Sequence, residues 1–264
     1  MDKNSHIFSI RTSDGKSLKF EYKDSLPSAA ALAKQYAIAG YPDRYVVFTE
    51  KQTAFSAMGT PLSNGESENG IFLSCILRPS IFRSQAGVIS PLSALACTLA
   101  LEEYTSKALG IGWTSDIYCD GNKIGGVTME SLLDEKSSYE YYEYIIVTFA
   151  IKLDEKNFPK RLTDMVRQVF EEDNLSIPMI MAKTILNKFF SFYADLKNPE
   201  KHLATFATKF ALADKKITYL DNGKKKSARV VGINNDDLSL CIETRDGRRI
   251  NVSSSSSVII PTKL

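Results

Sequence analysis

The chain has 264 residues, of which 44% are hydrophobic and 24% charged, a composition typical of a globular protein with a sizeable core. Four widely spaced cysteines and only two histidines argue against a disulfide framework or a zinc site, and the formal net charge of +2 gives no global field that would attract nucleic acid. No apolar run reaches the roughly 20 residues that span a bilayer, and the N-terminus lacks a signal-peptide pattern. We therefore expect a cytoplasmic protein with no metal site, no nucleic-acid partner and no membrane partner.

Residues 1–212 alternate strand and helix signals, which predicts an α+β fold with a mixed β-sheet flanked by helices. Strands are predicted at 16–22, 45–49, 71–77, 111–118, 124–131 and 139–153. Helices are predicted at 28–39, 91–109, from Pro159 through Val169, 179–196 and 200–212. For the helix at 91–109 we expect Ser90 as the cap, Pro91 at the first position and Gly110 at the end. Residues 51–70 show no element, and a loop of that length is usually functional or disordered.

Residues 213–264 have a different character and predict a separate small β-barrel domain. Several short strand patterns alternate there with turn sequences such as Asp-Asn-Gly and Arg-Asp-Gly. Ten Lys or Arg against six Asp or Glu give this segment a charge of +4. Lysines such as Lys224 to Lys226 are typical of solvated strand edges. Docking of an acidic partner is the alternative interpretation.

One segment carries a specific motif. Residues 112–127 read GWTSDIYCDGNKIGGV, and Trp113, Asp116, Lys123 and Gly126 keep the identity and spacing of the signature hairpin of biotin protein ligases, which this segment resembles. The strand at 70–79 and the helix predicted after it agree with the family in sequence order. The resemblance implies the class II synthetase-like biotin/lipoate ligase fold for 1–212 and an SH3-like β-barrel for 213–264, without the DNA-binding domain that some members carry in front.

The resemblance also implies a two-step reaction. The carboxylate of biotin attacks the α-phosphate of ATP, with Mg²⁺, to form biotinyl-AMP, and a lysine of biotin carboxyl carrier protein or a similar domain then attacks the acyl carbon. In this scheme the Lys123 ammonium reaches both the carboxylate and the phosphate, and Asp116 accepts or orients the proton of the incoming lysine. Family members often form homodimers, so a homodimer is possible here. The remaining residues implied to contact biotin are Ser25, Gln52, Trp113, Gly125 and Gly126, and those implied to face the nucleotide are Ser115 and Lys152.

Three other family motifs are altered in this chain. The family loop Q-x-x-G-R-G-R-x-G-R corresponds to QTAFSAMGTP at 52–61, which keeps Gln52 but no arginine. The motif G-x-G-I-N corresponds to TFAIK at 148–152, and S-T-N to Ser25-Leu26-Pro27. We expect Phe55 and Phe149 to narrow the adenine side of the pocket and Lys152 to replace part of the lost charge.

These changes leave three functions open. The first is a biotin ligase with weak or altered activity. The second is a catalytically degenerate relative that binds a ligand or a carrier protein. The third is a ligase or transferase for another acyl group, such as lipoate or octanoate, because enzymes for those acids share the catalytic fold.

Overall fold

The computed structural model describes residues 5–54, 68–113, 115–134, 141–153, 176–234, 238–253 and 258–259. The predicted site residue Phe55, most of the predicted loop at 51–70 and the helix predicted from Pro159 through Val169 lie outside the described residues.

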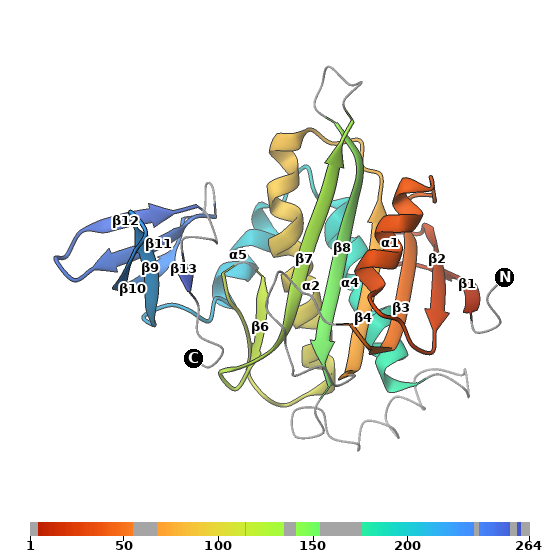
Figure 1. Cartoon of the computed structure of the whole chain (residues 1–264), viewed down its shortest axis with the longest axis horizontal. Coiled ribbons are helices and arrows are strands. Elements are labelled where there is room, and N and C mark those ends of the chain that lie inside the picture. The colour runs from red at the N-terminus through yellow and green to blue at the C-terminus, as the bar shows by residue number, and fades with distance from the viewer. Residues whose placement is uncertain are drawn as a thin grey trace.

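An eight-stranded sheet forms the centre of the larger part of the chain (Figure 1), in the order β1-β2-β3-β4-β8-β7-β6-β5. Its strands are β1 (Ser5–Arg11), β2 (Ser17–Lys23), β3 (Tyr45–Gln52), β4 (Glu68–Leu77), β5 (Leu109–Ile111), β6 (Asp116–Cys119), β7 (Asn122–Leu133) and β8 (Tyr142–Lys152). Only β2 and β3 are paired in parallel, and every other neighbouring pair is antiparallel. The predicted mixed sheet is therefore confirmed.

The strands differ from the prediction at two places. The edge strand β1 was not predicted, although it pairs with β2 along its whole length. The strand predicted at 111–118 is instead two strands, because the chain turns between Gly112 and Ser115. A Cβ atom at Gly112 would lie 2.8 Å from the Tyr118 ring, and Ser115 has a left-handed backbone with φ of 72°.

Helices cover both faces of this sheet (Figure 1): α1 packs on one face, and α2 and α4 pack on the other. The helices are α1 (Ala29–Ile38), α2 (Ile89–Leu101), α4 (Ile177–Ala194) and α5 (Glu200–Thr208), with 3-10 turns at Arg83–Val88 and Glu102–Tyr104. Together with the mixed sheet, these layers confirm the predicted α+β architecture.

The helix predicted at 91–109 is wrong at both ends. It starts at Ile89 with Val88 as the N-cap residue, so Ser90 lies inside the first turn and does not cap. Pro91 is tolerated in that turn because the first N–H groups of a helix have no intrahelical acceptor. The helix ends at Leu101, and Gly110 lies in β5.

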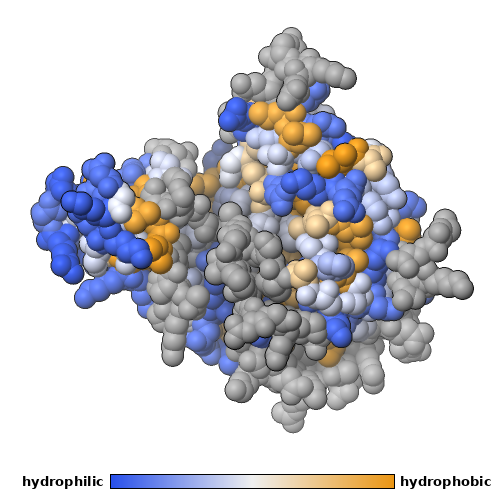
Figure 2. Space-filling model, in the orientation of Figure 1, coloured by the Kyte–Doolittle hydropathy of each residue, from blue (hydrophilic) through white to orange (hydrophobic). Residues whose placement is uncertain are grey.

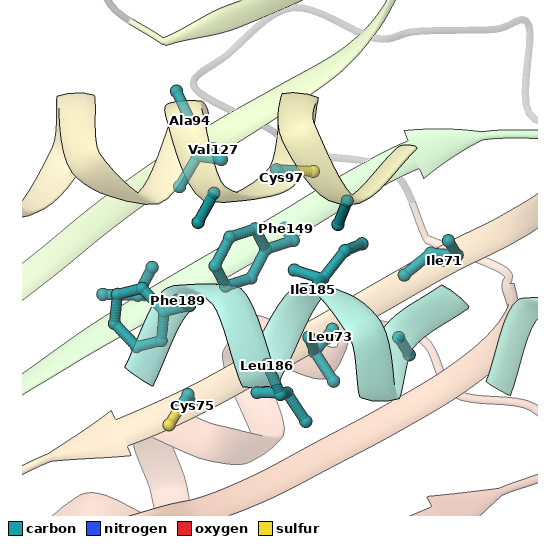
Figure 3. Close-up of a cluster of buried hydrophobic side chains, with 14 of the residues drawn as sticks. Ile71, Leu73, Cys75, Ala94, Cys97, Val127, Phe149, Ile185, Leu186 and Phe189 are labelled. Atoms are coloured by element: carbon teal, nitrogen blue, oxygen red, sulfur yellow. The ribbon is translucent and has the colours of Figure 1, made fainter. Parts of the chain in front are cut away.

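The main core lies between the sheet and the α2–α4 layer. In Figure 3, Phe149 of β8 projects between these two helices, near Ile185 and Phe189 of α4. The span Gln85–Tyr104, which contains α2, is long and apolar enough to cross a bilayer, but 61% of its apolar window is buried. Polar residues such as Ser93 interrupt this span, so the sequence shows no continuous apolar run there. This burial is typical of a core helix in a globular protein.

The C-terminal part forms a second, five-stranded antiparallel sheet in the order β12-β11-β10-β9-β13. Its strands are β9 (Lys216–Asp221), β10 (Lys224–Ile233), β11 (Leu240–Thr244), β12 (Arg249–Val252) and β13 (Val258–Ile259). These strands confirm a β-rich C-terminal part. Closure into a barrel and the boundary at residue 212 stay predictions.

Two connections hold the second sheet against the first. The Ile111 N–H donates to the Lys209 carbonyl at 2.8 Å, and the Ala211 N–H donates to the Ile111 carbonyl at 2.9 Å. The segment after α5 thereby continues the main sheet at β5. The side chain of Trp113 also lies in the core of the second sheet, beside Leu212 and Ile217.

Candidate active site

A half-exposed strip on the α1 face of the main sheet, formed by β6, β7 and β8, carries the predicted site residues Asp116, Lys123, Gly126 and Lys152. Asp116 of β6, Gly126 of β7 and Ala150 of β8 are in register across three neighbouring strands. Residues directly opposite one another share a face, so these three positions lie side by side. Because α1 packs mainly over β3, β4 and β8, this strip of the sheet stays partly open to solvent.

The hairpin between β6 and β7 brings Lys123 and Asp116 together. Asp120 and Gly121 form its turn with φ of 46° and 76°, the conformation of a type I′ turn. A register shift between Ile117 and Tyr118 follows. The Lys123 Nζ atom lies 2.7 Å from Asp116 Oδ1, with 27% and 21% of the two side chains exposed.

The surroundings of this pair favour proton uptake by Asp116. Burial raises the pKa of the Asp116 carboxyl group, and the hydrogen bond and charge of Lys123 offset only part of that rise. The pKa of Tyr118 is also raised, by burial and then by the negative charge of Asp116. The pair therefore combines a cation with a carboxylate of increased proton affinity.

Gly125 and Gly126 are explained by strand packing. A Cβ atom at Gly125 would lie 2.1 Å from the Ala150 carbonyl oxygen, and one at Gly126 would lie 3.0 Å from the Ser115 carbonyl oxygen. Both glycines thus let β7 approach its neighbours closely. Contact between these glycines and biotin stays a prediction.

The N-terminus of α1 lies at the same end of the sheet as the Lys123 pair. Ser28 caps the helix by accepting from the Ala31 N–H at 3.2 Å. The Gln52 side-chain oxygen accepts from the Ala29 N–H at 3.0 Å. The side-chain carbonyl of Gln52 therefore caps the start of α1, and the side-chain NH₂ of Gln52 is the group that can donate to a ligand.

Two further predicted residues are exposed at this end. Ser25 lies one residue before Leu26, which forms an isolated bridge with Gln52. Lys152 is the last residue of β8 and lies opposite Gly70 of β4. It is two residues after Ala150 and therefore faces the same side of the sheet, the α1 side. The structure therefore gathers Lys123, Asp116, Gln52 and these two residues at one end of one sheet face.

Phe149 points the other way, and the prediction that it narrows the pocket is wrong. Successive side chains of a strand face opposite sides of the sheet. Phe149 is fully buried between the sheet and α4, with its ring centroid 5.7 Å from that of Phe189. The side chains that enter the α1 face are those of its neighbours, Thr148 and Ala150.

Trp113 and Ser115 have structural partners. The Trp113 indole N–H donates to the Leu238 carbonyl at 3.0 Å, within the core of the second sheet. Ser115 is 4% exposed, and its hydroxyl lies 2.7 Å from that of Ser90 at the start of α2. Their contacts with biotin and with the nucleotide stay predictions.

Sequence reasoning missed two polar pairs on this face. The hydroxyls of Ser74 and Thr148 lie 2.9 Å apart on β4 and β8. Lys34 of α1 forms an ion pair with Glu130 of β7 at 2.9 Å, which spans the strip farther along the sheet. The only sequence signal was the period-two alternation of each strand, which does not show which strands become neighbours. Within the described residues, no group of three His, Cys, Asp or Glu side chains could hold a metal ion.

Comparisons with known proteins give curated relatives over part of the chain and solved structures over most of it. No family model matches the chain. The bifunctional ligase/repressors BirA of Bacillus subtilis and Bacillus spizizenii are each 27% identical over 146 residues, 54% of this chain and 44% of each relative. The chain thus spans less than half the length of these curated relatives.

Solved structures match over most of the chain. Biotin protein ligase from Aquifex aeolicus in complex with biotin and ATP is 16% identical with a TM-score of 0.65, covering 91% of this chain and 97% of that one. The Leishmania major biotin protein ligase in complex with biotinyl-5-AMP is 18% identical with a TM-score of 0.54, covering 89% and 98%. A biotin protein ligase-like protein of unknown function from Silicibacter sp. is 12% identical with a TM-score of 0.55, covering 89% and 94%. At these low identities, the TM-scores show a shared fold alone.

Proposed function

Because the chain is a divergent member of the biotin protein ligase family, we propose that it activates biotin with ATP to biotinyl-AMP and transfers the biotinyl group to a lysine of a carrier domain. The single observation that carries this proposal is the Lys123–Asp116 pair, with 2.7 Å between its charged atoms, on the open strip beside the start of α1. The strip and the adjoining start of α1 offer the Lys123 ammonium group and the Gln52 side-chain NH₂ where a carboxylate and a phosphate would have to meet.

In the first step, an oxygen of the biotin carboxylate bonds to the α-phosphorus of ATP and pyrophosphate leaves. We assign Lys123 the role of holding the carboxylate and the α-phosphate. Its ammonium group has three donors, one of which is directed to Asp116, so the others can bind the biotin carboxylate and the α-phosphate. Lys152, exposed at the same end of the sheet, adds a second positive charge. Gln52 donates from its amide NH₂ to the biotin end of the ligand.

In the second step, we assign Asp116 the role of proton acceptor. The carrier lysine forms an amide bond with the acyl carbon, AMP leaves, and the proton released by the lysine passes to the Asp116 carboxylate. The raised pKa of Asp116 suits this role, because a carboxylate with a higher pKa is a better base. Mg²⁺ would enter with the phosphates of ATP, and no residue of this chain is assigned to it.

We propose a cytoplasmic location, because ATP is the substrate and the four cysteines are free thiols. The C-terminal sheet is proposed to be an SH3-like barrel domain. The carrier is proposed to be biotin carboxyl carrier protein or a similar domain, and a homodimer stays possible.

The test is a mass-spectrometric assay for biotinyl-AMP with purified protein, biotin, ATP and magnesium. Lys123→Ala should abolish the product, whereas Lys197→Ala, which changes an exposed lysine after α4, should leave it unchanged. Absence of the product from the unmodified protein at millimolar ATP would contradict the proposal.

A second function is favoured by one feature of the site, the loss of every arginine from 52–61. A phosphate site without these cations loses hydrogen bonds worth about 1.5–3 kcal/mol each. In this case the chain would be a catalytically silent module that binds a ligand or a carrier protein. Calorimetry with biotin, combined with the adenylate assay in the presence of ATP, distinguishes the two, because a silent module that holds biotin would bind it but form no adenylate when ATP is supplied. Replacing biotin with lipoate or octanoate tests the remaining acyl substrates in the same assay.

A further inference from the structure

A groove of about 560 Å³ lies on the C-terminal sheet, apart from the Lys123 site. One wall is formed by β9 and β10 and the other by the turn between β11 and β12. Its residues include Thr218, Tyr219, Lys225, Lys226, Arg245 and Arg248. In Figure 2 the end of this sheet farthest from the main sheet is covered mainly by hydrophilic residues.

The groove has an excess of positive charge. Four of its residues are cationic, and Asp246 is its one acidic residue. Lys226 pairs with Asp221 at 2.5 Å, and Arg248 pairs with Asp246 at 2.7 Å. No carboxylate among the described residues lies within ion-pair distance of Lys225 or Arg245.

Two other cations of this sheet are paired, whereas Lys216 and Lys224, which do not line the groove, have no described carboxylate within ion-pair distance. Arg229 contacts Asp214 at 2.7 Å and Glu243 at 3.2 Å, and Arg249 contacts Glu243 at 3.5 Å. Within the groove, the two cations without a described carboxylate, Lys225 and Arg245, lie on opposite walls. Such a concave surface attracts discrete negative charges.

The lining favours an acidic protein segment over a nucleic acid. Single-stranded nucleic acids bind where exposed aromatic rings stack on the bases. The one aromatic residue of the groove, Tyr219, is 5% exposed and belongs to the core of the sheet. Hydroxyl groups of Thr218 and Ser227, also in the lining, suit hydrogen bonds to carboxylates and to a peptide backbone.

We propose that this groove binds an acidic segment of a partner protein, whose carboxylates pair with Lys225 and Arg245. The proposal is independent of the chemistry at Lys123, because the two sites share no residue. It assigns to the C-terminal sheet a recognition surface for glutamate- and aspartate-rich sequence.

The test is fluorescence anisotropy of the full chain with a labelled glutamate-rich peptide. The double variant K225E/R245E should bind the peptide at least about tenfold more weakly, and K225Q/R245Q should show a smaller loss in the same direction. The control K16E/K197E makes the same change in net charge at exposed lysines of the larger part of the chain and should stay within about twofold of the unmodified protein.

Binding should also weaken as salt concentration rises, because the contacts are exposed ion pairs. Three results would overturn the proposal: an equal loss in the K16E/K197E control, equal binding of a peptide with glutamine in place of glutamate, or tighter binding of an oligothymidine of the same charge. Thermal melting of each variant verifies folding, and all of the altered side chains are exposed.

Discussion

The two members of the Lys123–Asp116 pair should contribute unequally to stability. Burial raises the pKa of Asp116 despite the nearby ammonium, so the ionised carboxylate is held in the folded protein at a net cost in free energy. Lys123→Gln removes the charge that compensates this carboxylate. Asp116→Asn removes the costly charge itself and leaves a lysine that is 27% exposed and can turn to solvent.

The magnitude follows from the geometry. At 2.7 Å, two unit charges attract by about 1.5 kcal/mol in water and by about 6 kcal/mol at an effective dielectric constant of 20. Desolvation offsets most of the larger value. Because both side chains are partly exposed, we expect Lys123→Gln to destabilise the fold by about 1–2 kcal/mol at pH 7. We expect Asp116→Asn to stay within about 0.5 kcal/mol of the unmodified protein or to be slightly more stable.

Urea unfolding of both variants and of the double variant, at several pH values, measures these effects. The folded-state pKa of Asp116 lies above its ordinary value of 3.8. Protonation of Asp116 therefore stabilises the folded protein. This contribution is complete below pH 3.8 and is lost as the pH rises through the folded-state pKa of Asp116. The Lys123→Gln defect should accordingly shrink on acidification toward pH 4. Equal destabilisation by Asp116→Asn and Lys123→Gln, or a Lys123→Gln defect that does not depend on pH, would contradict this account of the pair.

Three further changes test the fold, two beside the site and one at the opposite end of the main sheet. Gly125→Ala should destabilise the protein by at least about 3 kcal/mol in thermal melting, because the Cβ atom of the alanine would lie 2.1 Å from a backbone oxygen of β8. A mild effect would mean that β7 can move away from β8. Trp113→Phe removes the N–H donor to the Leu238 carbonyl and should destabilise the protein by about 1 kcal/mol. Because this bond ties the second sheet to the first, backbone amides of β9 to β12 should exchange hydrogen faster. Unchanged exchange would contradict a role of Trp113 in holding the two sheets together. Burial alone would raise the pKa of Asp14, but hydrogen bonds from Arg44 and other donors outweigh burial and lower the pKa from 3.8 to about 2. About 2–3 kcal/mol of stability should therefore be present above pH 3.8 and be lost as the pH falls through about 2. Asp14→Asn should remove this acid-dependent loss in urea unfolding, and an unchanged profile would contradict it.

The Lys123–Asp116 pair could be predicted because it depends on a local hairpin. A turn of two residues with positive φ, at Asp120 and Gly121, fixes the register of the flanking strands within a few positions. Spacing in the sequence therefore translates directly into distance. The same locality explains why most strands of the main sheet were predicted.

Features that depend on distant parts of the chain were not predictable. Alternation shows that Phe149 and Ala150 face opposite sides of the sheet, but not which side carries α1 and which carries α2. Only the packing of α4 against the sheet decides that Phe149 is core.

The end of α2 shows the same limit. Residues up to 109 keep a helical pattern, yet the Ala108 carbonyl accepts from the Asp120 N–H at 3.0 Å, which ties it to the hairpin. Ser90 resembles a cap in sequence, but its hydroxyl lies beside that of Ser115, 25 residues away. Local propensity was overridden by tertiary contacts in both cases.

The chain contains one tryptophan, and it lies where the two sheets meet, three residues before Asp116. Its indole ring is largely buried and its N–H is bound to a carbonyl of the second sheet. Emission from this ring, excited selectively, would therefore report on a single place in the molecule. The wavelength or intensity of this emission would change when a ligand shifts the β6–β7 hairpin, and also when a partner shifts the C-terminal sheet. The fluorescence of the unlabelled protein can therefore show whether binding at the Lys123 site affects the groove of the C-terminal sheet, and the reverse.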